Sequence, residues 1–231
     1  MILQKIKNYF NARTIVTNSL LIVMLLVFIA ETFDGGSTNV ATLLKYGASF
    51  NPLIVLRNQW WRLFTAQFVH IGFLHIASNA VIIYYVGSIL EPMIGSWRFL
   101  FVYLLSGVGG NLLSFAFGND LTTSAGASTA LFGLFGVVIA LAVKLRGYAP
   151  VAQFGKQLFA LAAVNIFLDL FISQVDIFGH IGGLLTGFLL GIVIGGGVYK
   201  SIYNNKIRAL ALVALIIYVV FAIRTGMVLS N

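Results

Sequence analysis

The chain has 231 residues, of which 60% are hydrophobic and only 9% are charged, and its mean hydropathy is +1.00. Soluble globular domains carry about 25% charged residues, so this composition excludes a soluble domain and indicates a polytopic membrane protein. The 14 Lys and Arg form no basic stripe, which argues against nucleic-acid binding and favours a role in membrane topology. Because the chain has no Cys, disulfides, thiolate metal ligands and a cysteine nucleophile are excluded as well.

Seven apolar segments are each about long enough to cross the ~30 Å hydrocarbon core of a bilayer as a helix. No small-residue cleavage pattern follows the first segment, so we expect a retained span rather than a signal peptide. The connections are short except near 33–72, and there is no internal repeat, which predicts a single membrane domain over 1–231. The seven segments lie near 15–32, 73–94, 97–117, 127–145, 157–175, 179–199 and 207–227.

The distribution of positive charge predicts the orientation of these spans. A cytoplasmic N-terminus over 1–14 places ten basic residues inside and four outside, which satisfies the positive-inside rule. The inner set is Lys5, Lys7, Arg13, Arg98, Lys144, Arg146, Lys156, Lys200, Lys206 and Arg208; the outer set is Lys45, Arg57, Arg62 and Arg224. Ser128 and His180, near the outer ends of the fourth and sixth spans, then lie roughly 5–10 Å below the outer surface, at a depth that water can reach through a cavity that opens outward.

The second span begins with a polar cluster, FVHIGFLHIASN. His75 and Asn79 are four residues apart, so both side chains project from one helical face. Their N–H groups are suitable donors to an oxyanion, while hydrogen bonding between helices is the simpler alternative. His70 lies off that face and nearer the surface, and we interpret it as structural.

The fourth span begins with the stretch SAGASTALFG, in which Ser128 is the candidate nucleophile. Backbone N–H groups in the first turn of a helix have no intrahelical partner and can bind an anion. Gly126 allows the chain to bend and a substrate to approach closely. The simpler alternative for this one serine is a hydroxyl that bonds back to its own helix.

The sixth span begins with FGHIGGLLTG, and His180 is the candidate base that would activate a serine hydroxyl. Glycines recur every four residues from Gly179 to Gly195, which predicts a smooth stripe that lets another helix approach closely. His180 lies beside that stripe and therefore faces a close neighbour. An interfacial histidine that caps or anchors the span is the alternative.

Taken together and in this order, the segments WRLFTAQFVH, HIASN, EPMIGSWRF, GASTALFG and GHIGGLLTG resemble those of rhomboid intramembrane serine proteases. The resemblance covers most of residues 60–191. It implies a six-helix core, here 15–199, followed by a seventh helix and tail at 200–231. It also implies a Ser–His dyad of Ser128 and His180, and an oxyanion hole of the Ser128 backbone, His75 and Asn79, with Gly126 in the GxSx motif. The long connection with Trp61 and Arg62 would be a loop that dips partly into the bilayer.

Three positions near the dyad bear on this resemblance. Many relatives have Tyr four residues after the nucleophile, whereas this chain has Phe132, which can orient His180 by ring packing but not through a hydroxyl. Asp176 precedes His180 by four residues and is a possible third member, but the family's dyad argues against this and a helix-start charge is simpler. Asp169 within the fifth span is a functional candidate with no assignable role, and pairing with Asn165 or Ser173 is the simpler alternative.

These observations predict an all-α membrane enzyme, a serine endopeptidase that cleaves in or next to transmembrane segments of other proteins and needs no metal or other cofactor. The absence of HExxH argues against a zinc protease, and the absence of a second suitable Asp argues against an aspartyl dyad. A transporter or a helix-binding protein that does not cleave is the alternative. The expected partners are transmembrane substrates and the lipid bilayer, and the compact chain without a transit-like extension favours a bacterial plasma membrane.

Overall fold

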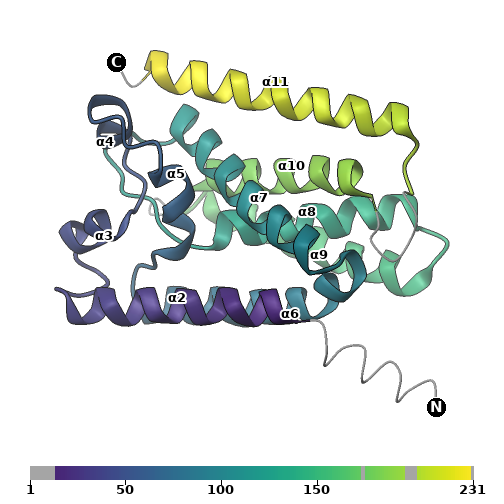
Figure 1. Ribbon diagram of the computed structural model, residues 1–231, viewed down its shortest axis with the longest axis horizontal. Helices are drawn as coiled ribbons and strands as arrows, with labels where there is room; N and C mark the ends of the chain where they lie inside the picture. The colour runs from purple at the N-terminus through teal and green to yellow at the C-terminus, as the bar shows by residue number, and fades with distance from the viewer. Residues whose placement is uncertain (1–13, 173–174, 196–201, 230–231) are drawn as a thin grey trace.

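The computed structural model describes residues 14–172, 175–195 and 202–229. Within these ranges the chain is all-α, and the residues outside helices include an isolated bridge between Ser49 and Ser124. The long helices are α2 (Ile15–Phe33), α6 (Phe73–Ile94), α7 (Ser96–Phe117), α8 (Ser128–Lys144), α9 (Ala149–Asp169), α10 (Ile177–Ile194) and α11 (Asn205–Leu229). Figure 1 shows them as a bundle whose axes run mostly along one direction, as expected for a protein that spans a bilayer.

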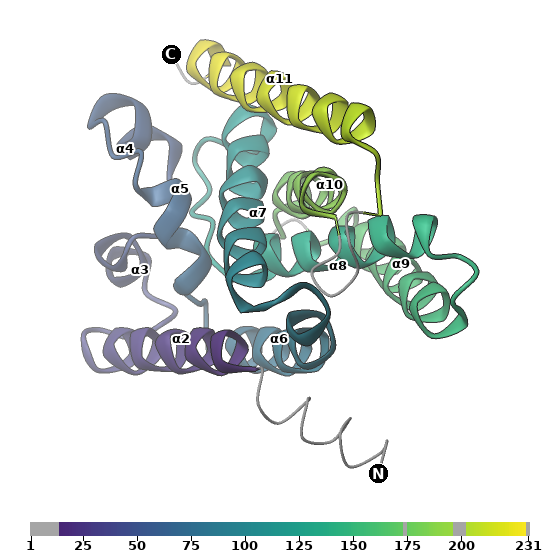
Figure 2. The same ribbon diagram turned by 45° about the vertical axis from the view of Figure 1, so that its right-hand side comes forward.

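Six of these helices are long and apolar enough to cross a membrane, and the remaining one, α8, is a shorter apolar helix of 17 residues. At 1.5 Å per residue α8 is about 25 Å long, less than the ~30 Å of hydrocarbon. Most of its residues are buried, because α7, α9 and α10 all pack around it (Figure 2). A short central helix leaves its first residue, Ser128, recessed in the bundle.

The predicted boundaries agree with the observed helices to within two residues, except for the fifth span and for the end of the sixth, which we expected near 199 but which α10 reaches at Ile194. We expected the fifth span near 157–175, but α9 begins at Ala149 and ends at Asp169. Pro150 in the first turn favours a helix start there, while Lys156 and Gln157 lower the local hydropathy and displace the expected boundary. As a consequence, Asp169 is the last residue of its helix rather than a residue within the span.

The glycine stripe of α10 produces the close approach that the sequence predicts. A Cβ atom at Gly183 would overlap the carbonyl oxygen of Thr129 on α8, and one at Gly187 would overlap that of Gly133. Side chains at these positions would force the helices apart. Since His180 is one residue from Gly179 at the start of the stripe, the contact between α10 and α8 brings the histidine toward the start of α8.

The connection from residue 34 to residue 72 holds the short helices α3 (Val40–Tyr46), α4 (Asn51–Leu56) and α5 (Arg62–Thr65) and the 3-10 turn η1 (Ala66–Phe68). Arg62 is buried and donates hydrogen bonds of 2.8 Å to the carbonyl oxygens of Leu44 and Ala48, which tie this loop together. The bridge from Ser49 to Ser124 then attaches it to the segment that precedes α8.

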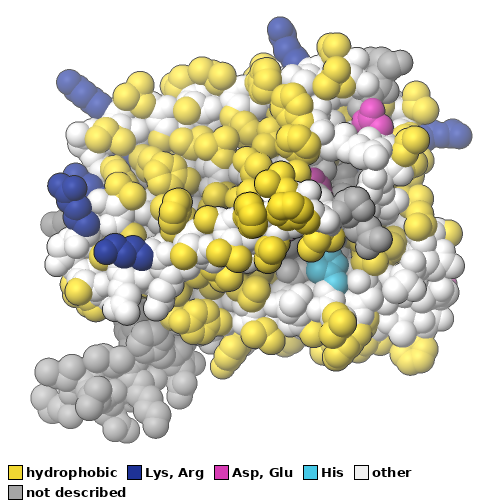
Figure 3. All heavy atoms as spheres, turned by 180° about the vertical axis from the view of Figure 1, so that it is seen from behind, with side chains coloured by type: hydrophobic (Ala, Val, Ile, Leu, Met, Phe, Trp, Pro, Cys, Tyr) yellow, Lys and Arg dark blue, Asp and Glu magenta, His cyan; other side chains and the backbone are white. Residues whose placement is uncertain are grey.

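The two ends of the bundle differ in charge. The long connection and the starts of α8 and α10 lie at one end, while the α6–α7 and α8–α9 turns lie at the other (Figure 1). In Figure 3 hydrophobic side chains cover the middle of the rear face, and Lys and Arg gather mainly toward its left edge.

Helix α11 packs outside α7 and α10 (Figure 2), where the Tyr218 hydroxyl donates a hydrogen bond of 2.6 Å to the Gly109 carbonyl.

Candidate active site

Ser128 is the first residue of α8 and follows a backbone bend at Gly126. Gly126 has φ +135°, which L side chains rarely adopt, and a Cβ there would lie 2.6 Å from His75 Cε1. Glycine is thus required for both its conformation and its size. The Gly126 N–H donates to the Ala66 carbonyl at 3.0 Å, which holds the bend against η1.

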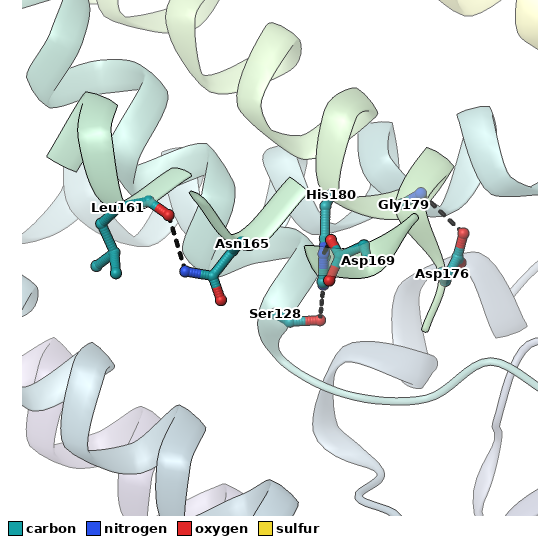
Figure 4. Close-up of polar contacts among 7 residues, drawn as sticks. All are labelled: Ser128, Leu161, Asn165, Asp169, Asp176, Gly179 and His180. Carbon is teal, nitrogen blue, oxygen red and sulfur yellow. Dashed lines mark hydrogen bonds and ion pairs between the residues drawn. The ribbon is translucent and has the colours of Figure 1, made fainter. Parts of the chain in front are cut away.

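His180 lies in the first turn of α10 and contacts Ser128 directly. Its Nε2 is 2.9 Å from Ser128 Oγ (Figure 4), and the histidine is buried. The ring stacks on Phe132 with centroids 4.2 Å apart and an interplanar angle of 7°. The phenylalanine thus orients the imidazole by packing, as its position four residues after Ser128 predicts.

The structure distinguishes the two acids near His180. Asp176 is the N-cap of α10, where Oδ1 accepts a hydrogen bond of 2.9 Å from the Gly179 N–H and Oδ2 accepts one of 2.9 Å from Ser124 Oγ. Its predicted role as a helix-start charge is confirmed. Asp169, in contrast, has Oδ2 2.7 Å from His180 Nδ1 (Figure 4), on the side of the ring away from Ser128.

The contact to Asp169 is the feature that sequence reasoning missed. The simpler pairing with Asn165 is wrong, because the Asn165 amide donates to the Leu161 carbonyl at 2.8 Å (Figure 4), and Ser173 lies outside the described residues. An intramembrane acid was the only available signal. Asp169 and His180 are eleven residues apart in the sequence. Because the predicted end of this helix was wrong, that separation gave no reason to place the two side chains next to each other.

His75 and Asn79 of α6 converge on the Gly126 bend, as their spacing predicts. A Cβ at Gly126 would lie 2.7 Å from His75 Nε2 and 3.7 Å from Asn79 Nδ2. Asn79 is buried, and its Nδ2 has no hydrogen-bond partner in the described part of the chain. Buried donors are normally paired, so a free amide beside a nucleophile is a candidate site for a substrate oxygen.

A cavity of about 640 Å³ connects these groups. Its lining includes His75, Asn79, Ser128, Asp169 and His180, contributed by four different helices. Among the described residues there is no cluster of three or more His, Asp or Glu that could hold a metal ion.

His70 lies behind the site and supports the segment before Ser128. It is fully buried, its Nδ1 donates to the Phe68 carbonyl at 3.2 Å, and its Nε2 accepts from the Ala127 N–H at 3.3 Å. Burial, and secondarily the positive charge that His75 can carry, lowers the pKa of His70 to about 3. A neutral ring retains the lone pair that this acceptor role needs, in agreement with the predicted structural role.

Comparison with known proteins gives consistent matches. Residues 57–197 match the family model of the Rhomboid domain. The chain is 35% identical over 205 residues to Rhomboid protease GluP of Bacillus subtilis (strain 168), covering 89% of this chain and 40% of the relative. It is 39% identical over 155 residues to RHOMBOID-like protein 2 of Arabidopsis thaliana, covering 67% of this chain and 48% of the relative. It is 35% identical over 156 residues to Rhomboid-like protease 3 of Toxoplasma gondii, covering 66% of this chain and 58% of the relative. The chain thus spans only about half the length of these relatives.

Proposed function

Because the chain belongs to the rhomboid family, we propose that it is an intramembrane serine protease, which hydrolyses peptide bonds in or next to transmembrane segments of other membrane proteins. The observation that carries this proposal is the distance of 2.9 Å between Ser128 Oγ and His180 Nε2 at the start of a recessed helix. A serine hydroxyl is a poor nucleophile until a neighbouring base accepts its proton, and this geometry supplies that base.

In the proposed reaction, Ser128 Oγ attacks the carbonyl carbon of the scissile bond while His180 Nε2 accepts its proton. The imidazolium then donates that proton to the leaving amine, which leaves an acyl group on Ser128. A water molecule releases the acyl group in a second step, with His180 again as the base. Both steps develop negative charge on the carbonyl oxygen.

The donors proposed for that oxygen are the Ser128 backbone N–H, His75 and Asn79. The first N–H groups of α8 lack intrahelical acceptors, and the Asn79 amide is buried without a partner among the described residues. Donors that are already oriented stabilise the transition state without reorganisation. The cavity beside them provides space for a substrate backbone and for water.

The geometry also sets a physical requirement on the substrate. A carbonyl inside a regular helix is hydrogen-bonded to the N–H four residues later and shielded by side chains. A transmembrane substrate must therefore unwind locally before Ser128 can reach the bond. We expect cleavage where residues of low helix propensity or a membrane boundary make unwinding inexpensive.

We further propose that the site faces the outer side of a bacterial plasma membrane, with a cytoplasmic N-terminus. Arg98, Lys144 and Arg146 lie near the ends of α7 and α8 that are opposite to Ser128. Positive charge is enriched on the cytoplasmic side of membrane proteins, which supports this orientation.

The test is cleavage of a single-span model substrate by the protein purified in detergent. We expect the parent to cleave it, and Ser128→Ala and His180→Ala to be inactive. Ser88→Ala serves as the matched control, since this half-buried serine on α6 donates its hydroxyl to the Tyr85 carbonyl of its own helix. Cleavage by Ser128→Ala at the parental rate would refute the proposal.

A further inference from the structure

We propose that Asp169 is a positioning residue for His180, which holds the imidazole of the proposed Ser–His pair in the form and orientation that the reaction needs. This inference rests on the proposed function. Its basis is a continuous chain of contacts, from Asp169 Oδ2 to His180 Nδ1 at 2.7 Å and from His180 Nε2 to Ser128 Oγ at 2.9 Å (Figure 4). The three residues come from the end of α9 and the starts of α10 and α8.

The carboxylate determines which ring nitrogen carries the proton. A neutral imidazole has one N–H, and an ionised carboxylate can only accept a hydrogen bond. Asp169 therefore selects the form with the proton on Nδ1. This leaves the lone pair on Nε2, where it can accept the proton of the Ser128 hydroxyl.

Asp169 also restricts a rotation that ring packing leaves free. The stack on Phe132 fixes the plane of the imidazole, because parallel rings 4.2 Å apart resist tilting. Stacking does not prevent the ring from turning within that plane. The contact to Asp169 on one edge and to Ser128 on the other fixes this remaining orientation.

The environment strengthens the interaction. The side chains of His180 and Asp169 are only 10% and 7% exposed, so little water competes for the contact. When Ser128 loses its proton to His180, the imidazolium forms beside the carboxylate. Asp169 thus stabilises positive charge that arises during the reaction, which requires no movement of the acid.

The other acid near the ring does not supply this contact. Both oxygens of Asp176 already accept hydrogen bonds, from the Gly179 N–H and from Ser124 Oγ. These contacts hold the start of α10. Asp176 therefore provides a matched control of the same residue type near the same histidine.

The experiment compares kcat and KM of the parent, Asp169→Asn, Asp169→Glu and Asp176→Asn with the single-span substrate in detergent. The amide that Asp169→Asn introduces can donate to Nδ1 and stabilise the wrong form of the ring, so we expect kcat of this variant to fall by about 10²–10⁴. KM should stay within about threefold, since the carboxylate acts on His180 Nδ1 in the proposed role and affects the chemical step. Asp169→Glu restores an acceptor and should be faster than Asp169→Asn, while Asp176→Asn should keep kcat because Asn caps helices as well as Asp.

A second readout separates positioning from folding. The rate at which a fluorophosphonate probe labels Ser128 depends on His180, but not on recognition of a peptide. For Asp169→Asn we expect slow labelling together with a thermal unfolding midpoint close to the parent's. A kcat of Asp169→Asn within about threefold of the parent's would overturn the inference. If Asp169→Asn keeps its activity and Ser128→Ala is inactive, only the role of Asp169 is refuted. If Ser128→Ala is itself active, the proposed protease mechanism is refuted.

Discussion

The unpartnered amide of Asn79 leads to a prediction in which activity and stability change differently. Its side chain is buried, and Nδ2 has no hydrogen-bond partner among the described residues. An unsatisfied buried donor costs about 1–3 kcal/mol of stability in the free protein. If the amide instead donates to the substrate oxyanion, this cost is recovered only in the transition state.

The substitution Asn79→Ala removes the donor from both states. Loss of one oxyanion donor raises the barrier by about 2.7–4 kcal/mol, which lowers kcat by about 10²–10³. The free protein loses no hydrogen bond of Nδ2, so its thermal unfolding midpoint should remain the same or rise. A purely structural asparagine would show the reverse, with a lower midpoint and little change in kcat per folded molecule.

Initial rates of cleavage at several substrate concentrations give kcat and KM, and circular dichroism in the same detergent gives the midpoint. Asn18→Ala is the control, because this asparagine is exposed on another membrane-spanning helix, α2. A kcat within about threefold of the parent's, or a midpoint that falls together with kcat, would refute the role of Asn79 as a donor.

Three further predictions follow from the packing and the buried histidine. Gly126→Ala should lower kcat at least about tenfold, because its φ of +135° strains any L side chain by about 1–3 kcal/mol and the new Cβ displaces His75. Gly187→Ala should lower the free energy of unfolding by about 1–3 kcal/mol or more through overlap with α8, whereas Gly147→Ala, with open space around it, should change it by less than about 0.5 kcal/mol. The pKa of His70 is about 6.5 in the unfolded chain and about 3 in the folded protein, so between these pH values the unfolded chain binds the extra proton. The free energy of unfolding should therefore decrease as pH falls from 6.5 toward 3, by up to about 1.4 kcal/mol per pH unit.

Each of these has a defined contrary outcome. Parental cleavage by Gly126→Ala would show that the bend tolerates a side chain. Equal unfolding midpoints for Gly187→Ala and Gly147→Ala would contradict the close contact between α10 and α8. For His70, the measurement is the pH dependence of unfolding of the parent minus that of His70→Gln, and a difference independent of pH would contradict a buried neutral histidine.

The sequence predicted most of the bundle because the relevant signals are local. Hydropathy located the ends of the long helices to within two residues, except for the fifth span and the end of the sixth, and the four-residue period of glycine predicted the surface of α10 that meets α8. The spacing of His75 and Asn79 predicted that they share a face, since helical geometry relates residues four apart. The fifth span was misplaced because Lys156 and Gln157 lie inside a helix whose start is marked by Pro150.

The sequence by itself determined the membrane class, the approximate helices and the candidate pair Ser128 and His180, because composition, periodicity and motif are properties of neighbouring residues. Only the tertiary structure decided which acid meets His180. Asp176 has the helical spacing but caps α10, while Asp169 reaches the imidazole because it is the last residue of α9 and lies beside the start of α10. A hydrogen bond requires atoms within about 3 Å, and no pattern along the chain specifies the end of one helix relative to another that accurately.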